Sequence, residues 1–153
     1  MTTKEKVTEA IASTLVIDDE LYPRTSVNST HVVAMVAALE AGHTFPPIVI
    51  EKDTLIIVDG VHRRAAHLRA HGEDAVVTVQ IMDFSGDRGA LFEAALRFNS
   101  SHGQNFSSYD KARAVARGEA LGMTREQIAG ALNMTRDRLE SFHRQRVANG
   151  KPV

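Results

Sequence analysis

An apolar run ends at a glycine and passes at once into an arginine-rich segment between Ile56 and Ala66. The apolar residues predict a buried strand, and Gly60 permits a tight turn after it. A helix that starts at this turn offers unpaired backbone N–H groups at its positive end, and Arg63 or Arg64 would add a guanidinium fork. A phosphate group is the natural ligand of this arrangement. The same pattern also fits an ordinary strand-to-helix turn whose arginines face solvent, so both interpretations stay open.

A second pattern lies between Thr124 and Val147. A helix-turn-helix unit needs a small residue where its helices cross and, four positions later, a turn residue that tolerates left-handed geometry. An apolar residue six positions further on locks the second helix onto the first. Ala129, Asn133 and Leu139 occupy these three places. The spacing predicts a helical hairpin that binds DNA, although hairpins of this kind can also pack only against protein.

The second helix of this hairpin is expected to begin at Thr135, which suits an N-cap as Thr124 does for the first. Its outward side chains are polar with basic flanks, as insertion into a DNA groove requires. Three arginines are expected to hold DNA phosphates, and the other polar residues to face base edges. The predicted DNA-binding residues are Arg125, Thr135, Arg136, Asp137, Glu140, Ser141, Arg144 and Arg146.

The distribution of charge supports two functional halves. The whole chain has a net charge of −1, but residues 1–103 carry 9 basic against 14 acidic side chains, and residues 104–153 carry 9 against 5. A surplus of basic side chains in the C-terminal part is expected of a protein that contacts the DNA phosphate backbone, although solvent-exposed helices without a ligand can carry the same surplus.

The elements that must position these residues follow from hydrophobic periodicity and turn residues. The expected strands are residues 14–17, 48–50, 55–58 and 76–82, and the expected helices are 29–41, 62–71 and 87–99. No strand pattern remains after this point, so residues 107–149 are expected to be helical throughout. The sequence therefore predicts an α+β protein with one domain over residues 1–103 and a helical domain over residues 104–153.

Composition excludes several classes of protein. The chain of 153 residues has no cysteine, which rules out a disulfide framework, a thiolate zinc site and a cysteine nucleophile. No apolar run approaches the ~20 residues that a membrane span needs, and the first residues lead into no signal-peptide core. These features predict a cytoplasmic protein without a membrane partner.

The order of these motifs resembles the ParB partition-protein family and its relatives, over about residues 12–147. Tyr22-Pro23-Arg24 is similar to the family's Gln-Pro-Arg motif, and Gly60-Val61-His62-Arg63 is similar to its Gly-Glu-Arg-Arg phosphate motif. Residues 98–102 are similar to its Glu-Asn-x-x-Arg motif, and residues 42–48 to the segment that wraps the base and sugar of CTP. The N-terminal fold of this family is a small α/β domain shared with sulfiredoxin.

The resemblance implies a nucleotide, CTP with Mg²⁺, as well as double-stranded DNA and a homodimer associated with the nucleoid. Partition proteins usually continue into a separate dimerisation domain beyond the segment that matches this chain. In the family, the asparagine of the Glu-Asn-x-x-Arg motif helps to hold Mg²⁺, which makes Asn99 the candidate metal contact. The nucleotide-binding residues that the resemblance implies are Thr44, Phe45, Pro46, Gly60, His62, Arg63, Arg64, Asn99, Ser101 and His102.

Several positions depart from the partition proteins and are closer to regulator-type relatives. Val61 stands where partition proteins have glutamate and where sulfiredoxin has its reactive cysteine, so the sulfiredoxin reaction is excluded. Phe98 replaces an acidic residue implied in metal binding and hydrolysis, and His102 replaces an arginine. Because Mg²⁺ prefers hard oxygen ligands, the missing carboxylate argues against nucleotide hydrolysis.

The sequence thus favours a sequence-specific DNA-binding protein, a regulator or partition-type factor, with no catalytic residue assigned. One alternative is an enzyme that uses the Gly60–Arg63 pocket as a nucleoside triphosphatase or Mg²⁺-dependent nuclease. Nucleases normally gather two or more carboxylates, whereas Asp59 stands alone beside the motif. Another alternative is an adaptor whose helices bind protein. His67 and His71 lie one helical turn apart, but no acidic residue nearby completes a metal site.

Overall fold

The computed structural model describes residues 6–24, 27–101 and 106–141. Its contacts divide the chain into two compact units. The first, Met1–Asp18 with Ser26–Gly86, contains every strand among the described residues and is called the sheet unit here. The second, Asp19–Thr25 with Asp87–Val153, contains the remaining helices and is called the helical unit.

The sheet unit is built on four strands in the order β1-β4-β2-β3. Neighbouring strands β4 and β2 are parallel, and the two outer pairs are antiparallel. The strands are β1 (Lys6–Ile11), β2 (Ile48–Glu51), β3 (Ile57–Asp59) and β4 (Val76–Met82). Central β2 is buried along its whole length, as expected of a strand that is covered on both faces.

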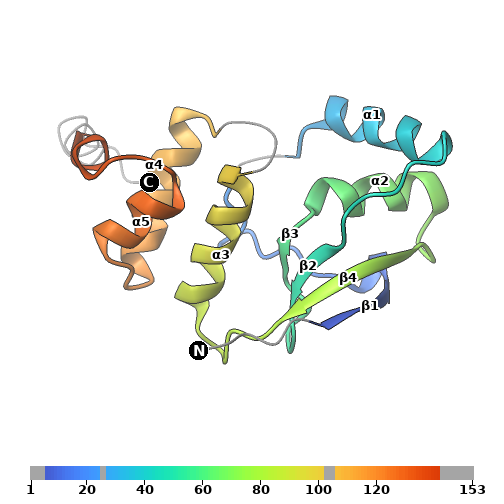
Figure 1. Cartoon of the computed structure of the whole chain (residues 1–153), viewed down its shortest axis with the longest axis horizontal. Helices are drawn as coiled ribbons and strands as arrows, with labels where there is room; N and C mark the ends of the chain where they lie inside the picture. Colours follow the sequence, from blue (N-terminus) through green and yellow to red (C-terminus); the bar gives the residue numbers. More distant parts are fainter. Residues whose placement is uncertain (1–5, 25–26, 102–105, 142–153) are drawn as a thin grey trace. The chain divides into compact units, whose positions relative to one another are not determined.

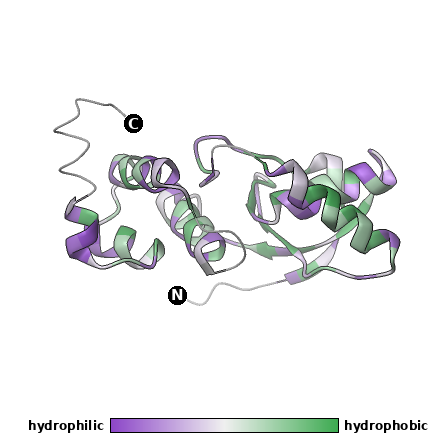
Figure 2. Cartoon of the chain, turned by 90° about the horizontal axis from the view of Figure 1, so that it is seen from above, coloured by the Kyte–Doolittle hydropathy of each residue, from purple (hydrophilic) through white to green (hydrophobic). Residues whose placement is uncertain are grey.

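Two helices accompany the sheet: α1 (Ser29–Glu40) packs on α2 (Val61–His71), and α2 contacts β2 and β4 (Figure 1). The side chain of Asn28 caps α1 by accepting a bond from the N–H of His31. The centre of the sheet is predominantly hydrophobic in Figure 2, and Ile48, Ile50 and Val79 are among the most completely buried of the described side chains. This core fixes the end of β3, from which α2 begins.

The helical unit contains α3 (Arg88–Ser101), α4 (Ser108–Ala120) and α5 (Arg125–Ala131), and residues 136–141 form a further helical segment. Ser107 and Thr124 each start a helix through a capping box, which satisfies backbone N–H groups that would otherwise lack a partner. The fully buried side chains at the centre of the unit are Phe92, Leu96, Val115, Ile128 and Leu139.

A short segment from early in the chain also belongs to the helical unit. The guanidinium of Arg113 on α4 donates to the carbonyls of Asp19, Tyr22 and Arg24 at 2.7, 3.1 and 3.1 Å. Burial, followed by the charge of Arg117, lowers the pKa of Arg113. Three carbonyl acceptors on one guanidinium attach this segment to α4 although it is about 90 residues away in sequence.

The predicted class, an α/β part followed by helices, is confirmed, with three local differences. β1 was not predicted, and the strand expected at residues 14–17 is a 3-10 turn followed by a single bridge from Val16 to Ile56. The C-terminal region is interrupted by turns at residues 121–124 and 132–135 and is not helical throughout.

The division into units also differs from the predicted domains, which met between residues 103 and 104. The units divide after Gly86, because α3 packs against α4 and α5. Within the described part of the chain, no helix combines the length and the apolar character that crossing a bilayer requires.

Candidate functional site

The turn from β3 into α2 has the geometry of an anion site. Gly60 caps α2 with φ 113°, in the left-handed region, and no side chain caps the helix N-terminus. A Cβ at this position would lie 3.1 Å from two side-chain carbons of Ile48 and 3.2 Å from its Cα. Glycine is therefore required both by the backbone angle and by the close approach of β2. A helix N-terminus without a side-chain cap is the kind of place where backbone N–H groups can bind an anion.

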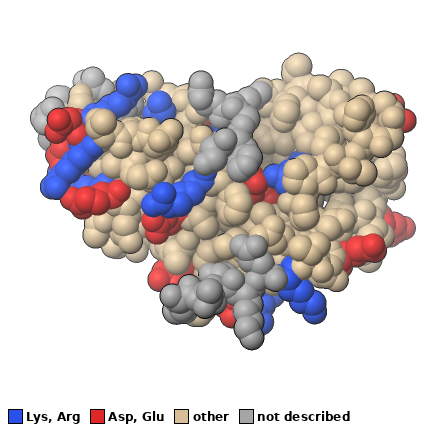
Figure 3. Space-filling model, in the orientation of Figure 1, with Lys and Arg blue, Asp and Glu red and all other residues tan. Residues whose placement is uncertain are grey.

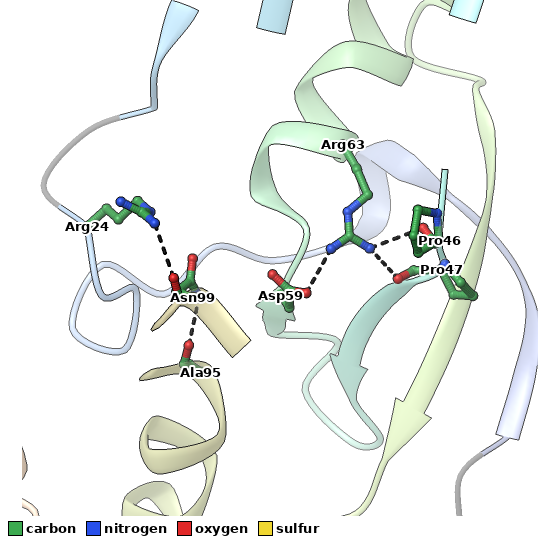
Figure 4. Close-up of polar contacts among 7 residues, drawn as sticks. All are labelled: Arg24, Pro46, Pro47, Asp59, Arg63, Ala95 and Asn99. Carbon is green, nitrogen blue, oxygen red and sulfur yellow. Dashed lines mark hydrogen bonds and ion pairs between the residues drawn. The ribbon is translucent and has the colours of Figure 1, made fainter. Parts of the chain in front are cut away.

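Arg63, which was predicted to be the guanidinium fork of this site, is held by the protein itself. It forms an ion pair with Asp59 at 2.7 Å, and the two side chains are only 16% and 14% exposed. Its other terminal nitrogen donates to the carbonyls of Pro46 and Pro47 at 3.1 and 2.5 Å (Figure 4). Arg63 thus fastens the segment before β2 to the first turn of α2. A phosphate at this turn would have to share the guanidinium with these acceptors.

The other two polar residues of the motif also have partners within the sheet unit. The Nε2 atom of His62 accepts a bond from the N–H of Asn28 at 3.0 Å, and its ring lies 5.2 Å from that of His31. Arg64 donates from Nε to the carbonyl of Ala12 at 3.0 Å. Both side chains connect α2 to neighbouring segments, so they contribute to the packing of the turn.

The segment predicted to surround a base and sugar lies beside this turn. Pro46 is joined to it through Arg63, and the ring of Phe45 lies edge-on to His67 of α2, with centroids 6.3 Å apart. The buried Nδ1 atom of His67 has no hydrogen-bond partner among the described residues, and burial, followed by the charge of His71, lowers the pKa of this imidazole. Thr44 is exposed. The structure thus brings Phe45, Pro46 and Arg63 into one neighbourhood.

The residues predicted from the Glu-Asn-x-x-Arg resemblance belong to the helical unit. Asn99 donates from its amide nitrogen to the carbonyl of Ala95 at 2.7 Å, and its own carbonyl accepts from Arg24 at 3.4 Å (Figure 4). Its Oδ1 atom has no partner among the described residues, so it could serve as a metal ligand. Ser101 is the last residue of α3, and His102 lies outside the described residues.

No group of three or more histidine or acidic side chains positioned to hold a metal ion occurs in residues 6–24, 27–101 and 106–141. His67 and His71 have ring centroids 6.3 Å apart. Asp59, the acidic residue beside the turn, is engaged by Arg63.

The three key positions of the predicted C-terminal hairpin lie within the described residues. Asn133 adopts φ 55°, in the left-handed region, between α5 and helix 136–141. Ala129 and Leu139 are buried, and the hydroxyl of Thr135 accepts from the N–H of Arg138 at 3.3 Å, as an N-cap does. Gly118 of α4 adds a contact that the sequence analysis missed, because a Cβ there would come within 2.8 Å of Ile128.

The side chains predicted to contact DNA are linked by ion pairs across the hairpin. Arg125 of α5 pairs with Glu140, and Arg136 pairs with Glu126 at 2.6 Å and lies 3.9 Å from Glu140. The pair with Glu140 raises the pKa of Arg125. Figure 3 shows basic and acidic side chains next to one another at the left of the view, over the helical unit. Asp137 is exposed and Ser141 half-buried, whereas Arg144 and Arg146 lie outside the described residues.

Comparison with known proteins gives solved structures of similar fold and no match by sequence. No protein-family model and no curated protein matches the chain. Among solved structures, the pNOB8-like ParB N-domain superposes with a TM-score of 0.57 at 17% identity, over 85% of this chain and 45% of that one. A second crystal form of that N-domain gives 0.54 at 20% identity, over 84% and 47%.

A third structure is the C-terminally truncated chromosome-partitioning protein ParB from Caulobacter crescentus complexed with CTP-γ-S. Its TM-score is 0.51 at 22% identity, over 90% of this chain and 76% of that one. The chain has the fold of these ParB proteins, as the sequence resemblance implied. It spans less than half the length of the two pNOB8-like chains.

Proposed function

We propose that the chain is a sequence-specific double-stranded DNA-binding protein of the ParB-like type, a transcription regulator or a partition-type factor. The observation that carries this proposal is the turn after α5, where Asn133 is left-handed while Ala129 and Leu139 are buried. Helix-turn-helix proteins use this combination to present their second helix to a major groove. The ParB N-domain fold of the chain supports the same proposal.

The predicted DNA-binding side chains would divide into base contacts and phosphate contacts. The guanidinium of Arg136 has the fork geometry that binds the O6 and N7 atoms of guanine, and a carboxylate such as Glu140 accepts from cytosine. Thr135, Asp137 and Ser141 would add contacts at the start and along the outer side of the helix. Phosphate contacts would come from Arg125, Arg144 and Arg146, which set affinity and not sequence.

Selection of duplexes from a random pool by the full chain tests this proposal. The expected result is an enriched sequence that the protein binds more tightly than random duplex at the same ionic strength, because affinity alone reports phosphate contacts. Ala129→Glu would introduce a charge at the helix crossing and should abolish this binding. If no sequence is enriched and parent and variant behave alike, the hairpin does not bind DNA and the adaptor alternative replaces it.

We further propose that DNA binding responds to a ribonucleoside triphosphate, CTP with Mg²⁺, at the Gly60 turn. Support comes from the uncapped N-terminus of α2 and from a ParB structure of the same fold that is complexed with CTP-γ-S. In this site the N–H groups of α2 would hold phosphate oxygens, and Arg63 would keep the Phe45–Pro47 segment against the turn. The metal would neutralise phosphate charge.

Calorimetric titration with each ribonucleoside triphosphate, with and without Mg²⁺ and the selected duplex, tests the nucleotide proposal. CTP is expected to bind, and Arg63→Ala to weaken its binding at least about tenfold, because the Phe45–Pro47 segment would lose the charge-assisted hydrogen bonds that hold it against the turn. Arg69→Ala, at an exposed position of the same helix, is the matched control. If no nucleotide releases or absorbs heat, the Gly60 turn has a structural role only and binds no nucleotide. Steady release of phosphate would favour the triphosphatase alternative.

Binding to DNA would also have consequences for the oligomeric state of the protein and for its location in the cell. A homodimer would present two hairpins to two half-sites about one helical turn of DNA apart, which predicts a palindromic selected sequence. A chromosomal or plasmid target would place the protein in the cytoplasm at the nucleoid. Sedimentation of the chain with the selected duplex tests the stoichiometry, with two chains per duplex as the expected result.

A further inference from the structure

A cavity of about 620 Å³ opens in the helical unit between α4 and the turn that follows α5. Its walls combine cations, neutral polar groups and a few apolar side chains. Lys111 comes from α4, Asn133 and Thr135 from the turn, Arg138 from the helix that follows, and Leu132 and Met134 supply apolar surface. None of the lining residues is acidic. The size lies in the range of small-molecule sites.

Lys111 and Arg138 differ from the other described cations of this unit in having no acceptor. Arg88, Arg97, Arg125 and Arg136 each pair with a carboxylate, and Arg24, Arg113 and Arg117 donate to backbone carbonyls. For the side chains of Lys111 and Arg138, the described residues offer no hydrogen bond or ion pair. The two positive charges without a partner in this part of the chain therefore line the same cavity.

The neutral polar groups of the wall are also suited to an anion. The side-chain amide of Asn133 has no partner among the described residues and carries two N–H donors. The oxygen of Thr135 already accepts from the N–H of Arg138, so its hydroxyl proton remains available to donate. Two cations and two neutral donors face a cavity without a carboxylate, which is the donor set that phosphate oxygens require.

The cavity is distinct from the surface proposed to contact bases. Arg138 is two residues from Arg136 and two from Glu140, and a helix turns about 100° per residue. Its side chain therefore points about 200° away from each of them, on the other side of the helix. Arg136 and Glu140, which form the ion pairs, lie on the proposed base-contacting side of the helix. Arg138 lies on the opposite side and lines the cavity together with Lys111.

We propose that Lys111 and Arg138 form a phosphate-binding site at the back of the turn, with Asn133 and Thr135 as additional donors. The phosphate can be that of a small phosphorylated ligand or a phosphodiester of the DNA backbone, and both sources present the same oxygens to the site. Its two cations, Lys111 and Arg138, are not among the proposed base-contacting residues, so the inference can hold or fail independently of those contacts.

Titration of the full chain with inorganic pyrophosphate, observed through backbone amide NMR signals, tests the site. We expect shifts at Asn133, Met134 and Thr135, and at least about tenfold weaker binding in Lys111→Gln and in Arg138→Gln. Arg88→Gln removes a charge of the same sign from α3 of the same unit and should leave the affinity unchanged. Unchanged thermal midpoints confirm that the variants are folded.

Binding to random duplex at several salt concentrations distinguishes the two sources of phosphate. If the DNA backbone occupies the site, each of the two variants lowers the slope of log affinity against log salt by about one. If a free ligand occupies it, the slope stays that of the parent and only pyrophosphate binding falls. Absence of shifts at the turn together with an unchanged slope would overturn the proposal, as would equal weakening of pyrophosphate binding by Arg88→Gln.

Discussion

At the scale of single residues, Gly60 carries both a left-handed backbone and a close contact with Ile48. An L-residue in this region costs about 1–2 kcal/mol, and Gly60→Ala adds a contact that Ile48 must relieve by moving. Gly42→Ala is the matched control, since Gly42 at the end of α1 has φ 91° but no atom within 4 Å of its Cβ position. We expect chemical denaturation to show a larger loss of stability for Gly60→Ala. Equal losses would mean that the Ile48 contact has no cost.

His67 makes the stability of the sheet unit depend on pH. Burial and, second, His71 lower its pKa in the folded state, whereas an unfolded histidine has a pKa of about 6.5. As pH falls below that value, the unfolded chain takes up the proton first, so the stabilisation present at higher pH is lost. We expect His67→Gln to reduce the loss of thermal stability between about pH 7 and pH 5. The same substitution at exposed His43 should keep the loss seen in the parent; identical curves for parent and His67→Gln would contradict this account.

Some residue roles could be predicted from the sequence because backbone geometry restricts residue type. Gly60 and Asn133 were predicted at turns, and both have positive φ. The partners of Arg63 could not be predicted, because the carbonyls of Pro46 and Pro47 reach it only through the packing of β2 beside α2. The sequence identified an arginine at the helix start but not the acceptors that occupy it.

At the scale of elements, the two helices of the hairpin are joined by charges that DNA would have to compete with. Glu126→Gln keeps the side-chain shape and releases Arg136 from its 2.6 Å ion pair. Because exposed pairs contribute at most about 1 kcal/mol, affinity for random duplex should rise by up to about fivefold. Glu93→Gln makes the same change in net charge and frees Arg97 on α3. If fluorescence anisotropy shows the same rise for both variants, net charge explains it and the hairpin pair does not.

Arg113 attaches the segment at residues 19–24 to α4 through three carbonyls, whereas Arg117 donates only to that of Asp19. Arg113→Met should therefore speed hydrogen exchange across this segment more than Arg117→Met does. Mass spectrometry of the exchanged peptides measures the difference. Equal exchange in the two variants would show that the segment is held by its apolar residues, such as buried Leu21.

At the scale of the whole molecule, the sequence predicted the class of fold and the order of most elements, because hydrophobic periodicity and caps are local properties. It did not predict β1, which pairs with β4 about 70 residues later and has mostly exposed side chains. It also assigned α3 to the N-terminal domain, whereas α3 packs with the C-terminal helices. Packing between segments far apart in the chain cannot be read from the local periodicity of hydrophobic residues.

The proposed hairpin would discriminate between DNA sequences chiefly through Arg136. Competition between the selected duplex and random duplex, at one ionic strength, measures this directly for the parent, Arg136→Ala and the control Arg97→Ala. We expect Arg136→Ala to reduce the discrimination by about 1–3 kcal/mol, the contribution of a bidentate base contact, and Arg97→Ala to retain the parent's value. A parent that binds both duplexes equally, or an Arg136→Ala variant that discriminates as well as the parent, would contradict the proposal.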